Sequence, residues 1–562
     1  MFENLSAERK KLQKEGKLPS WYTTQAWQTF KKSYAVAGEE AVLGRFKTIA
    51  KTLSKHLPSP YAEKYEKRFF DLMWEGKLSP ATPVLSNTGT NRGMPVSCSG
   101  QFIGNSIDSF YSNLRESALL SKYAFGTSGD FSSIVPRGTN LAKGGTANGV
   151  LPVIEDFFTC ASKVSQGGVR RGSFAAYLDV EHADFNEVIA DLIKNPSGKN
   201  IGWVIKDSFV ASLLDSNKEA LDKFKEIVYA KLKTGKGYLF FVDKANRHAP
   251  AMYKDKGLKV VASNLCSEIM LHSSNELTYS CVLSSVNLVH WNEIEKDDTI
   301  FDSVVFLDCV VSEFLEKSEG VAGLEKIREF TRLGRPIGLG VLGLHTYLQS
   351  IGVPFESLQA QFLDNQIFKR LHSETLRASK FLAELLGEPE WCKGYGVRNT
   401  HRTALAPTKS TAILMGGVSE STFPDPAAVF TAASSVGELS RIIPEFYKVL
   451  LKYGKYNDEV VNSIVNNFGS VQHLDFLTKE EKNVFKNAFE IDQEVILRRA
   501  SLRQKYLCQG QSLNFYVPQD ACETAVSKLI SKAILDPDIL SVYYAYSRSG
   551  VTVSDECIAC QA

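Results

Sequence analysis

Three observations predict an α/β protein built around one large domain. The chain has 562 residues, more than one hydrophobic core usually serves, so we expect a large catalytic domain with appendages. Hydrophobic residues make up 44% of the chain and charged residues 23%, as in ordinary globular proteins. From Ser79 onward, short apolar runs alternate with helical stretches, which is typical of an α/β architecture.

Residues 1–78 are predicted to form a helical region. Apolar residues between Val42 and Leu57 recur every three or four positions, and Pro58 ends the run. The same periodicity continues over Tyr61–Trp74. We expect these helices to lead into a catalytic region over residues 79–548.

Within that region, β-branched and aromatic residues favour four buried strands, at residues 174–180, 238–242, 259–262 and 513–517. A long helix is predicted over residues 357–386, with Gly387 as its C-cap. After Arg548 the chain loses its large apolar residues, so residues 549–562 are predicted to be a mobile tail.

Charge and hydropathy exclude several functional classes. The chain has 65 Lys and Arg residues and 63 Asp and Glu residues, which gives a net charge of +2. This balance does not indicate a surface that binds nucleic acid or a membrane. No apolar run approaches the roughly 20 residues that span a bilayer. The N-terminus lacks the pattern of a signal peptide. We therefore expect a cytoplasmic protein whose ten cysteines are mostly thiols.

Cys557 and Cys560 form a C-x-x-C pair two residues from the C-terminus. Two neighbouring thiols on a flexible tail can exchange electrons with any disulfide that the tail reaches. The alternatives are a chance pair or half of a zinc site, for which His473 is the nearest upstream histidine. Redox exchange is the better interpretation.

Asn264, Cys266 and Glu268 are spaced two residues apart, so in an extended segment they would share one face. That face would carry an amide, a thiol and a carboxylate. On spacing alone, a buried cysteine beside exposed polar residues is the more probable interpretation. Cys98 and Cys281, taken singly, also read as core residues.

Residues 406–411, Ala-Pro-Thr-Lys-Ser-Thr, precede an apolar stretch. A proline at a helix start, followed by hydroxyl residues and free backbone N–H groups, can hold a phosphate, and Lys409 would add positive charge. A plain helix N-cap is the usual alternative. The Gly/Arg loop at residues 167–172 is a weaker candidate for a nucleotide contact.

Taken in order, these segments resemble the large (α) subunit of class I ribonucleotide reductase. The resemblance covers roughly residues 79–562 and rests on these segments: residues 79–83, 97–98, 165–170, 264–269, 335–341, 406–411, 509–514 and 543–544. Many members of that family begin with an ATP cone that binds dATP. We see no such module in residues 1–78, so we expect a short form in which dATP does not shut down activity.

The resemblance implies a ten-stranded α/β barrel made of two five-stranded halves, with Cys266 on a loop through its centre. It implies reduction of ribonucleoside diphosphates to 2′-deoxyribonucleoside diphosphates for DNA precursor synthesis. Cys266 would carry a thiyl radical, Glu268 would act as general base and Asn264 would hold the substrate. Cys98 and Cys281 would face each other and supply two electrons, ending as a disulfide.

The resemblance also implies the path of electrons into the site. Cys557 and Cys560 would reduce the internal disulfide, and thioredoxin or glutaredoxin would then reduce the tail. Tyr543 and Tyr544 would relay a radical from the metal centre of a separate β subunit, with no metal in this chain. The alternative is that Tyr543 and Tyr544 are ordinary aromatic residues of a strand, without a role in radical transfer.

Two nucleotide sites follow from the same resemblance. The substrate would contact Thr82, Ser97, Gly126, Leu265, Ser267, Thr408, Lys409, Ser410 and Thr411. A dNTP or ATP effector would contact Asn105, Ser106, Ile107, Arg137, Gln166 and Arg170. The family often carries Asp where Asn105 stands. A homodimer is also implied.

Two other functions stay open at this point. An adenosylcobalamin-dependent reductase would make its radical within the same chain and would need no tyrosine pair. An inactive nucleotide-binding regulator would tolerate loss of a core thiol, and none is missing here. A short reductase also suits a viral source, in which case the host cytoplasm is the expected location.

Overall fold

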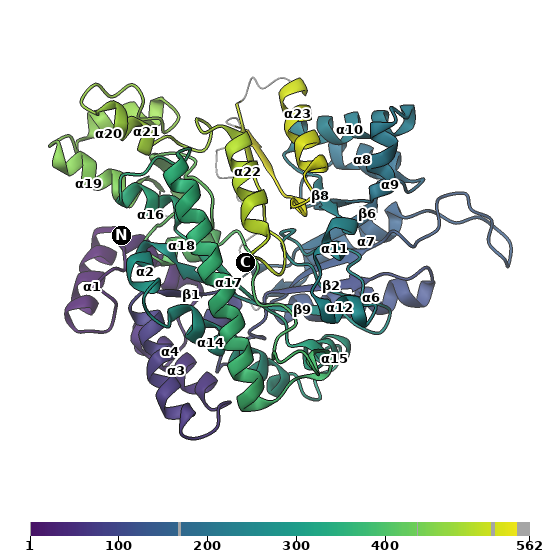
Figure 1. Cartoon of the computed structure of the whole chain (residues 1–562), viewed down its shortest axis with the longest axis horizontal. Coiled ribbons are helices and arrows are strands. Elements are labelled where there is room, and N and C mark those ends of the chain that lie inside the picture. Colours follow the sequence, from purple (N-terminus) through teal and green to yellow (C-terminus); the bar gives the residue numbers. More distant parts are fainter. Residues whose placement is uncertain (1, 167–169, 435–436, 519–522, 548–562) are drawn as a thin grey trace.

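The computed structural model describes residues 2–166, 170–434, 437–518 and 523–547 (Figure 1). The chain begins with four helices, α1 (Phe2–Lys14), α2 (Thr24–Ser33), α3 (Ala41–Ser54) and α4 (Tyr61–Trp74). The prediction for α4 is confirmed at both ends, whereas α3 ends three residues before Leu57. Phe69 of α4 packs edge-on against Phe306, with ring centroids 5.3 Å apart, which fastens these helices to the rest of the protein.

The first half of the central sheet contains five parallel strands. In spatial order they are β2 (Cys98–Phe102), β3 (Gly126–Asp130), β6 (Phe174–Asp179), β7 (Ile201–Ile205) and β8 (Tyr238–Phe241). Parallel neighbours need crossover connections, and helices supply them here. These helices are α6 (Ile107–Lys122), α7 (Leu151–Lys163), α8 (Phe185–Lys194), α9 (Asp207–Leu214) and α10 (Lys218–Thr234).

The second half also consists of five parallel segments. It begins with β9 (Tyr279–Asn287) and β10 (Ile337–Leu342). Parallel bridges then join Leu339 to Thr403 and Leu405 to Gln511. The last pair is β13 (Phe515–Val517) and β15 (Ala545–Ser547). The connecting helices are α14 (Thr299–Lys317), α15 (Glu325–Gly334), α17 (Leu358–Leu386), α22 (Gln493–Gln504) and α23 (Glu523–Leu535).

The two halves run antiparallel to each other and meet at two seams. At one seam β2 pairs with β9, and at the other β8 pairs with β14 (Ser541–Val542). Because β14 and β15 belong to one segment, these pairings close the sheet on itself. The predicted ten-stranded α/β barrel is therefore confirmed.

Most of the individual strand predictions hold. Residues 174–180, 238–242 and 513–517 contain β6, β8 and β13. The predicted strand at residues 259–262 is wrong, since only one bridge, between Val260 and His272, forms there. The side chain of Asn246 accepts from the Val260 N–H (3.0 Å) and donates to its carbonyl (2.8 Å), so these backbone groups are not available to a strand.

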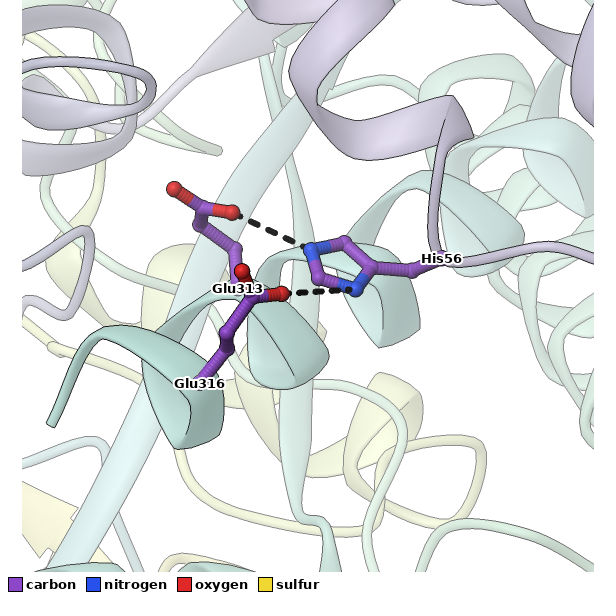
Figure 2. Close-up of side chains that lie close together, drawn as sticks. All are labelled: His56, Glu313 and Glu316. Atoms are coloured by element: carbon purple, nitrogen blue, oxygen red, sulfur yellow. Dashed lines mark hydrogen bonds and ion pairs between the residues drawn. The ribbon is translucent and has the colours of Figure 1, made fainter. Parts of the chain in front are cut away.

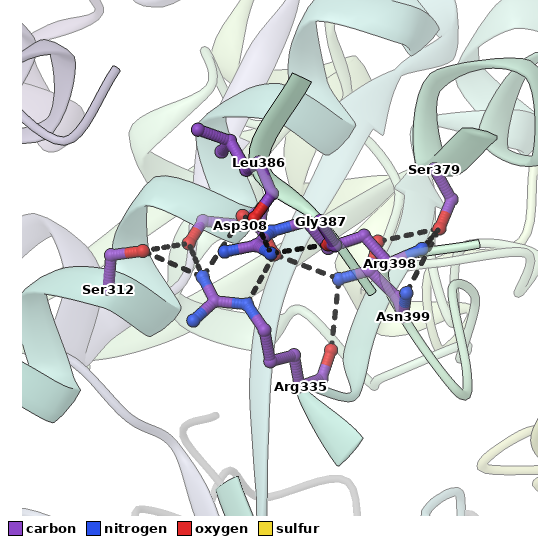
Figure 3. A network of polar contacts seen from close by, with 8 residues as sticks. All are labelled: Asp308, Ser312, Arg335, Ser379, Leu386, Gly387, Arg398 and Asn399. Atoms are coloured by element: carbon purple, nitrogen blue, oxygen red, sulfur yellow. Dashed lines mark hydrogen bonds and ion pairs between the residues drawn. The ribbon is translucent and has the colours of Figure 1, made fainter. Parts of the chain in front are cut away.

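Ion pairs of Asp308 join α14 to the segments that contain Arg335 and Arg398 (Figure 3). Asp308 on α14 accepts from Arg335 Nε (2.9 Å) and from Arg398 Nε (3.0 Å). Arg398 also donates to the carbonyls of Leu386 and Gly387 at the end of α17, at 3.0 and 2.7 Å. One carboxylate thus holds two guanidinium groups, and the helix C-terminus helps to compensate the second positive charge.

The remaining elements surround the barrel or extend from it. They are β1 (Leu78–Pro80), α5 (Thr82–Asn87), β4 (Ser165–Gln166), β5 (Arg170–Arg171), α11 (Val242–His248), α12 (Ala251–Asp255), η1 (Leu288–His290), α13 (Trp291–Ile294), α16 (Leu344–Ser350), η2 (Glu390–Cys392), α18 (Lys409–Leu414), β11 (Val429–Ser434), β12 (Gly437–Ile442), α19 (Pro444–Lys452), α20 (Asp458–Asn466) and α21 (Lys479–Val484). Helices α19 to α21 form a separate lobe at the upper left of Figure 1. Among the described residues, no helix is both long and apolar enough to cross a bilayer.

Candidate active site

Residues 264–268 form a tight turn and not the extended segment in which Asn264, Cys266 and Glu268 would share one face. The Ser267 N–H donates to the Asn264 carbonyl (3.2 Å), and Ser267 has a φ of 65°. The Asn264 side-chain oxygen accepts from the N–H groups of Glu268 (3.0 Å) and Ile269 (3.1 Å). These bonds bend the backbone around the asparagine in the manner of an Asx turn.

Both halves of the barrel hold this turn by its carbonyl groups. Tyr177 on β6 donates its hydroxyl to the Asn264 carbonyl at 2.6 Å. From the other half, Ser512 donates to the Cys266 carbonyl at 2.6 Å. Ser541 donates to the carbonyl of the next residue in the turn at 2.7 Å. Contacts from opposite halves place Cys266 inside the barrel, where it is 1% exposed.

Cys98 and Cys281 lie directly opposite each other in the register of β2 and β9. Opposed residues of antiparallel strands have Cα atoms about 4.5–5.5 Å apart, which lies within the range that a disulfide spans. Both cysteines are buried free thiols. Burial raises the pKa of Cys281 to about 12, so this thiol is protonated near neutral pH.

Amide side chains connect this cysteine pair to the turn. The Asn264 side-chain nitrogen lies 3.3 Å from the Cys98 sulfur. Gln509 approaches the Cys281 sulfur to 3.6 Å with its nitrogen and accepts from the Met270 N–H with its oxygen (3.1 Å). Sequence reasoning gave no role to Gln509, although the segment at residues 509–514 was recognised as a family signature.

Tyr543 and Tyr544 follow β14 and are both buried. Their ring centroids are 4.2 Å apart at an interplanar angle of 56°. They belong to the same cluster of buried side chains as Cys266. A third phenol was missed from the sequence: the Tyr238 hydroxyl is 3.0 Å from that of Tyr544, and its ring lies 4.7 Å from that of Tyr543.

Several candidate substrate residues border the cysteines. Gly126 on β3 pairs in register with Cys98, and a Cβ at Gly126 would lie 3.6 Å from a methyl group of Leu265 in the turn. The Ser97 hydroxyl is buried and has no hydrogen-bond partner among the described residues. Thr82 begins α5, and its hydroxyl lies 3.0 Å from that of Tyr34. A buried hydroxyl such as that of Ser97 is available to a ligand.

The expected phosphate loop differs from its prediction at the proline, and the alternative, a plain helix N-cap, does not form through Thr408. Helix α18 begins at Lys409, two residues after Pro407, so the proline does not start the helix. Thr408 precedes the helix with a φ of 59°, and its side chain does not cap it. Instead the Thr408 hydroxyl accepts from the Ser421 N–H at 2.8 Å. Ser410 and Thr411 follow on the first turn, both buried.

The candidate effector residues lie together at the start of α6. Asn105, Ser106 and Ile107 are exposed, and the Ser106 hydroxyl caps the helix. Arg137 forms an ion pair with Glu187 (2.9 Å from Nε), so its charge is already compensated. The strands that contain Gln166 and Arg170 pair as a hairpin, and β4 contacts α6. The side chains of that hairpin lie outside the described residues, as do Cys557 and Cys560.

One group of side chains in the described part of the chain has the spacing of a metal site (Figure 2). His56 lies 3.1 Å from Glu313 and 3.8 Å from Glu316, each through a different ring nitrogen. Lys55 pairs with the same two carboxylates at 3.4 and 3.3 Å. The group joins the end of α3 to α14, and Lys55 supplies a positive charge beside both carboxylates. We interpret it as an ion-pair contact between helices.

The fold and the site together define a class of enzyme. It is an α/β barrel whose two halves enclose a turn that contains one cysteine. Two further cysteines, placed so that they can form a disulfide, lie at the seam between the halves. Such an arrangement can carry out thiol–disulfide chemistry inside a site closed to solvent.

Comparison with known proteins identifies the family. The model of the ribonucleotide reductase barrel domain matches residues 96–212, 213–394 and 389–536, and that of the all-alpha domain matches residues 20–93. A protein of Frog virus 3 assigned to the large subunit of ribonucleoside-diphosphate reductase is 33% identical over 543 residues, which is 89% of this chain and 94% of that protein. The chain belongs to the ribonucleotide reductase large-subunit family.

Further relatives include a class Id and a vitamin B12-dependent reductase. The ribonucleoside-diphosphate reductase large subunit of Invertebrate iridescent virus 3 is 28% identical to this chain, and the match covers 94% of each of the two chains. The α subunit of the class Id ribonucleotide reductase of Actinobacillus ureae superposes with a TM-score of 0.85 at 36% identity, covering 96% of this chain and 99% of that one. A vitamin B12-dependent reductase of Mycobacterium tuberculosis is 28% identical over 88% of this chain and 70% of its own length.

Proposed function

We propose that this chain is the catalytic α subunit of a class I ribonucleoside-diphosphate reductase. The observation that carries the proposal is the arrangement of three buried thiols: Cys98 and Cys281 opposed in register, and Cys266 on the enclosed turn. Asn264 joins the two parts through its contact with Cys98. The relatives named above as ribonucleoside-diphosphate reductases support the same substrate class.

In the proposed reaction, a thiyl radical at Cys266 removes the 3′ hydrogen of the ribose. Glu268 takes the proton of the 3′-hydroxyl, and the 2′-hydroxyl leaves as water with a proton from the cysteine pair. The other thiol of the pair gives a hydrogen atom to C2′, and Cys98 and Cys281, having supplied two electrons, become a disulfide. Glu268 then returns its proton to the 3′ oxygen, and Cys266 returns the hydrogen to C3′. The balance is one ribonucleotide and two thiols giving one deoxyribonucleotide, one disulfide and water.

Two features of the site suit the residues to these tasks. The contact of Ser512 with Glu268, at 3.1 Å, holds the carboxyl group beside the turn. The burial that keeps Cys281 protonated preserves a hydrogen to be donated, and it also protects a radical from water. Thr408 to Thr411 would hold the diphosphate, and Ser97 would offer its free hydroxyl to the nucleotide.

The partners belong to the same proposal. Tyr543 and Tyr544 would relay the radical from a metal-containing β subunit, and their close packing near Cys266 supports that role. Cys557 and Cys560 would reduce the internal disulfide and be reduced by thioredoxin or glutaredoxin. We also propose that the chain forms a homodimer in the cytoplasm. A dNTP or ATP effector would bind near Asn105.

A turnover assay on CDP separates this function from its alternatives. With dithiothreitol and the β subunit encoded by the same genome, we expect dCDP to form, and adenosylcobalamin should not replace the β subunit. The similarity to a vitamin B12-dependent reductase is the reason to test adenosylcobalamin as the alternative. Product formation with adenosylcobalamin alone would favour that alternative, and CDP binding without turnover under either condition would favour an inactive regulator.

A further inference from the structure

Ser421 has a buried hydroxyl group whose hydrogen-bonding capacity the described residues leave unsatisfied. The side chain is 1% exposed, and its oxygen has no hydrogen-bond partner among the described residues. The residue has a φ of 47°, a conformation that glycine adopts more easily than serine. A serine is thus held in a glycine-like conformation with an unsatisfied hydroxyl, which calls for a ligand.

The backbone of Ser421 fixes this hydroxyl beside the proposed phosphate loop. Its N–H donates to the Thr408 side chain at 2.8 Å, which is the contact that replaces a helix cap there. Ser421 also lines a small cavity together with Ser512. The Ser512 hydroxyl lies 3.1 Å from Glu268, so two residues of the cavity lining contact the proposed phosphate loop and the proposed general base.

The buried charged groups next to Ser421 and Thr422 carry a net positive charge. Arg503 donates to the hydroxyl of Thr422, the residue after Ser421, at 2.8 Å. Arg503 and Arg499 share the single carboxylate of Asp364, at 2.8 and 3.3 Å. All three charged groups are at most 5% exposed, so two guanidinium groups on one carboxylate leave one net positive charge in a poorly solvated place. Such a charge favours an anion nearby.

We propose that Ser421 donates a hydrogen bond to the diphosphate of the nucleotide substrate. This inference rests on the proposed function, and it adds a donor held against Thr408, the residue that precedes α18. The Ser421 backbone is held by its contact with Thr408 and the side chain is short and buried, so little side-chain freedom would be lost on binding. The sequence gave no indication of this role, because Ser421 lies 13 positions from Thr408 in a segment without a motif.

The test compares Ser421→Gly with a matched control, Ser216→Gly. Ser216 also has a positive φ, of 56°, but it lies on the exposed surface. Binding of CDP and of cytidine to the reduced full-length chain is measured by calorimetry in the presence of a saturating effector. Thermal unfolding of each variant is followed in parallel.

Both glycine variants should unfold at the wild-type temperature or higher, since each relaxes a strained backbone. Ser421→Gly should weaken CDP binding about 10- to 100-fold, the usual effect of losing a hydrogen bond to a charged group. Its binding of cytidine, which has no phosphate, should match that of wild type. Ser216→Gly should bind both ligands like the wild type.

Three results would overturn the inference. Wild-type affinity of Ser421→Gly for CDP would show that water satisfies the hydroxyl. A parallel loss of cytidine binding would show that Ser421 shapes the site and does not contact the phosphates. Failure of the wild-type chain itself to bind CDP would overturn the proposed function, and this inference with it.

Discussion

At the scale of single residues, the side chain of Asn264 organises the site. Its oxygen closes the turn by accepting from Glu268 and Ile269, and its nitrogen reaches the Cys98 sulfur. One amide therefore sets both the position of Cys266 and its relation to the cysteine pair. Replacement by aspartate would remove the N–H donor to Cys98. The turn and the cysteine pair are therefore connected only when this position carries an amide.

Replacement of the proposed radical residue gives the first prediction. Cys266→Ser should lose CDP turnover by at least about 1,000-fold, because a serine O–H bond is too strong for reversible hydrogen transfer; a loss of that size corresponds to about 4 kcal/mol in the barrier. CDP binding should stay near the wild-type value, since serine is similar in size. The measurement pairs steady-state dCDP formation with calorimetry. Appreciable turnover would remove Cys266 from the radical role.

The tyrosine pair gives the second prediction. Tyr543→Phe and Tyr544→Phe each lose only a hydroxyl group from a buried ring, so both variants should fold and bind CDP. Turnover driven by the β subunit should nevertheless stop, because phenylalanine cannot pass an electron and a proton together. Tyr229→Phe, at an exposed position, is the matched control and should turn over normally. Near-normal activity in either buried variant would contradict the relay.

At the scale of elements, the antiparallel seam between β2 and β9 brings together cysteines that are far apart in the sequence. Composition and periodicity predicted a large α/β domain, and resemblance to a family was needed to predict the barrel. The opposition of Cys98 and Cys281 follows from strand register. No local pattern in the sequence specifies that register, because it depends on how the whole sheet closes.

Local predictions were wrong where a side chain competes with the backbone. Asn246 binds both backbone groups of Val260, so the apolar run at residues 259–262 does not form a strand. Asn264 similarly turns a segment that spacing alone would leave extended. The contact between Tyr238 and Tyr544 spans 306 positions, which explains why sequence reasoning did not find the third phenol. Such contacts are determined by tertiary structure, which local propensity does not describe.

At the scale of the whole molecule, the Asp308 network couples stability to pH. Burial alone would raise the pKa of Asp308, but Arg335 and Arg398 outweigh it and lower the pKa from 3.8 to about 2. Because the folded-state pKa lies below the unfolded value, the contribution to stability is complete above about pH 4 and is lost as pH falls toward 2. At about 1.4 kcal/mol per pKa unit, the pairing contributes roughly 2.5 kcal/mol.

The third prediction uses Asp308→Asn. Removing the carboxylate charge takes the counterion from the buried Arg335 and the largely buried Arg398, and breaking a buried ion pair typically costs about 3–5 kcal/mol. The melting temperature of the variant should be lower than that of wild type by a constant amount between pH 5 and 8, and the difference should shrink below about pH 4. Asp475→Asn, at an exposed position, should match wild type throughout. A difference that persists unchanged at pH 3 would contradict the linkage.

The most direct test of the proposed chemistry counts electrons in a single turnover. The double variant Cys557→Ser/Cys560→Ser is reduced, freed of reductant, and mixed with the β subunit and CDP. We predict one dCDP per chain at most, with a disulfide between Cys98 and Cys281 found by peptide mapping, whereas the chain with its tail cysteines should form up to two. Formation of dCDP while Cys98 and Cys281 both stay free thiols would contradict the proposed reaction.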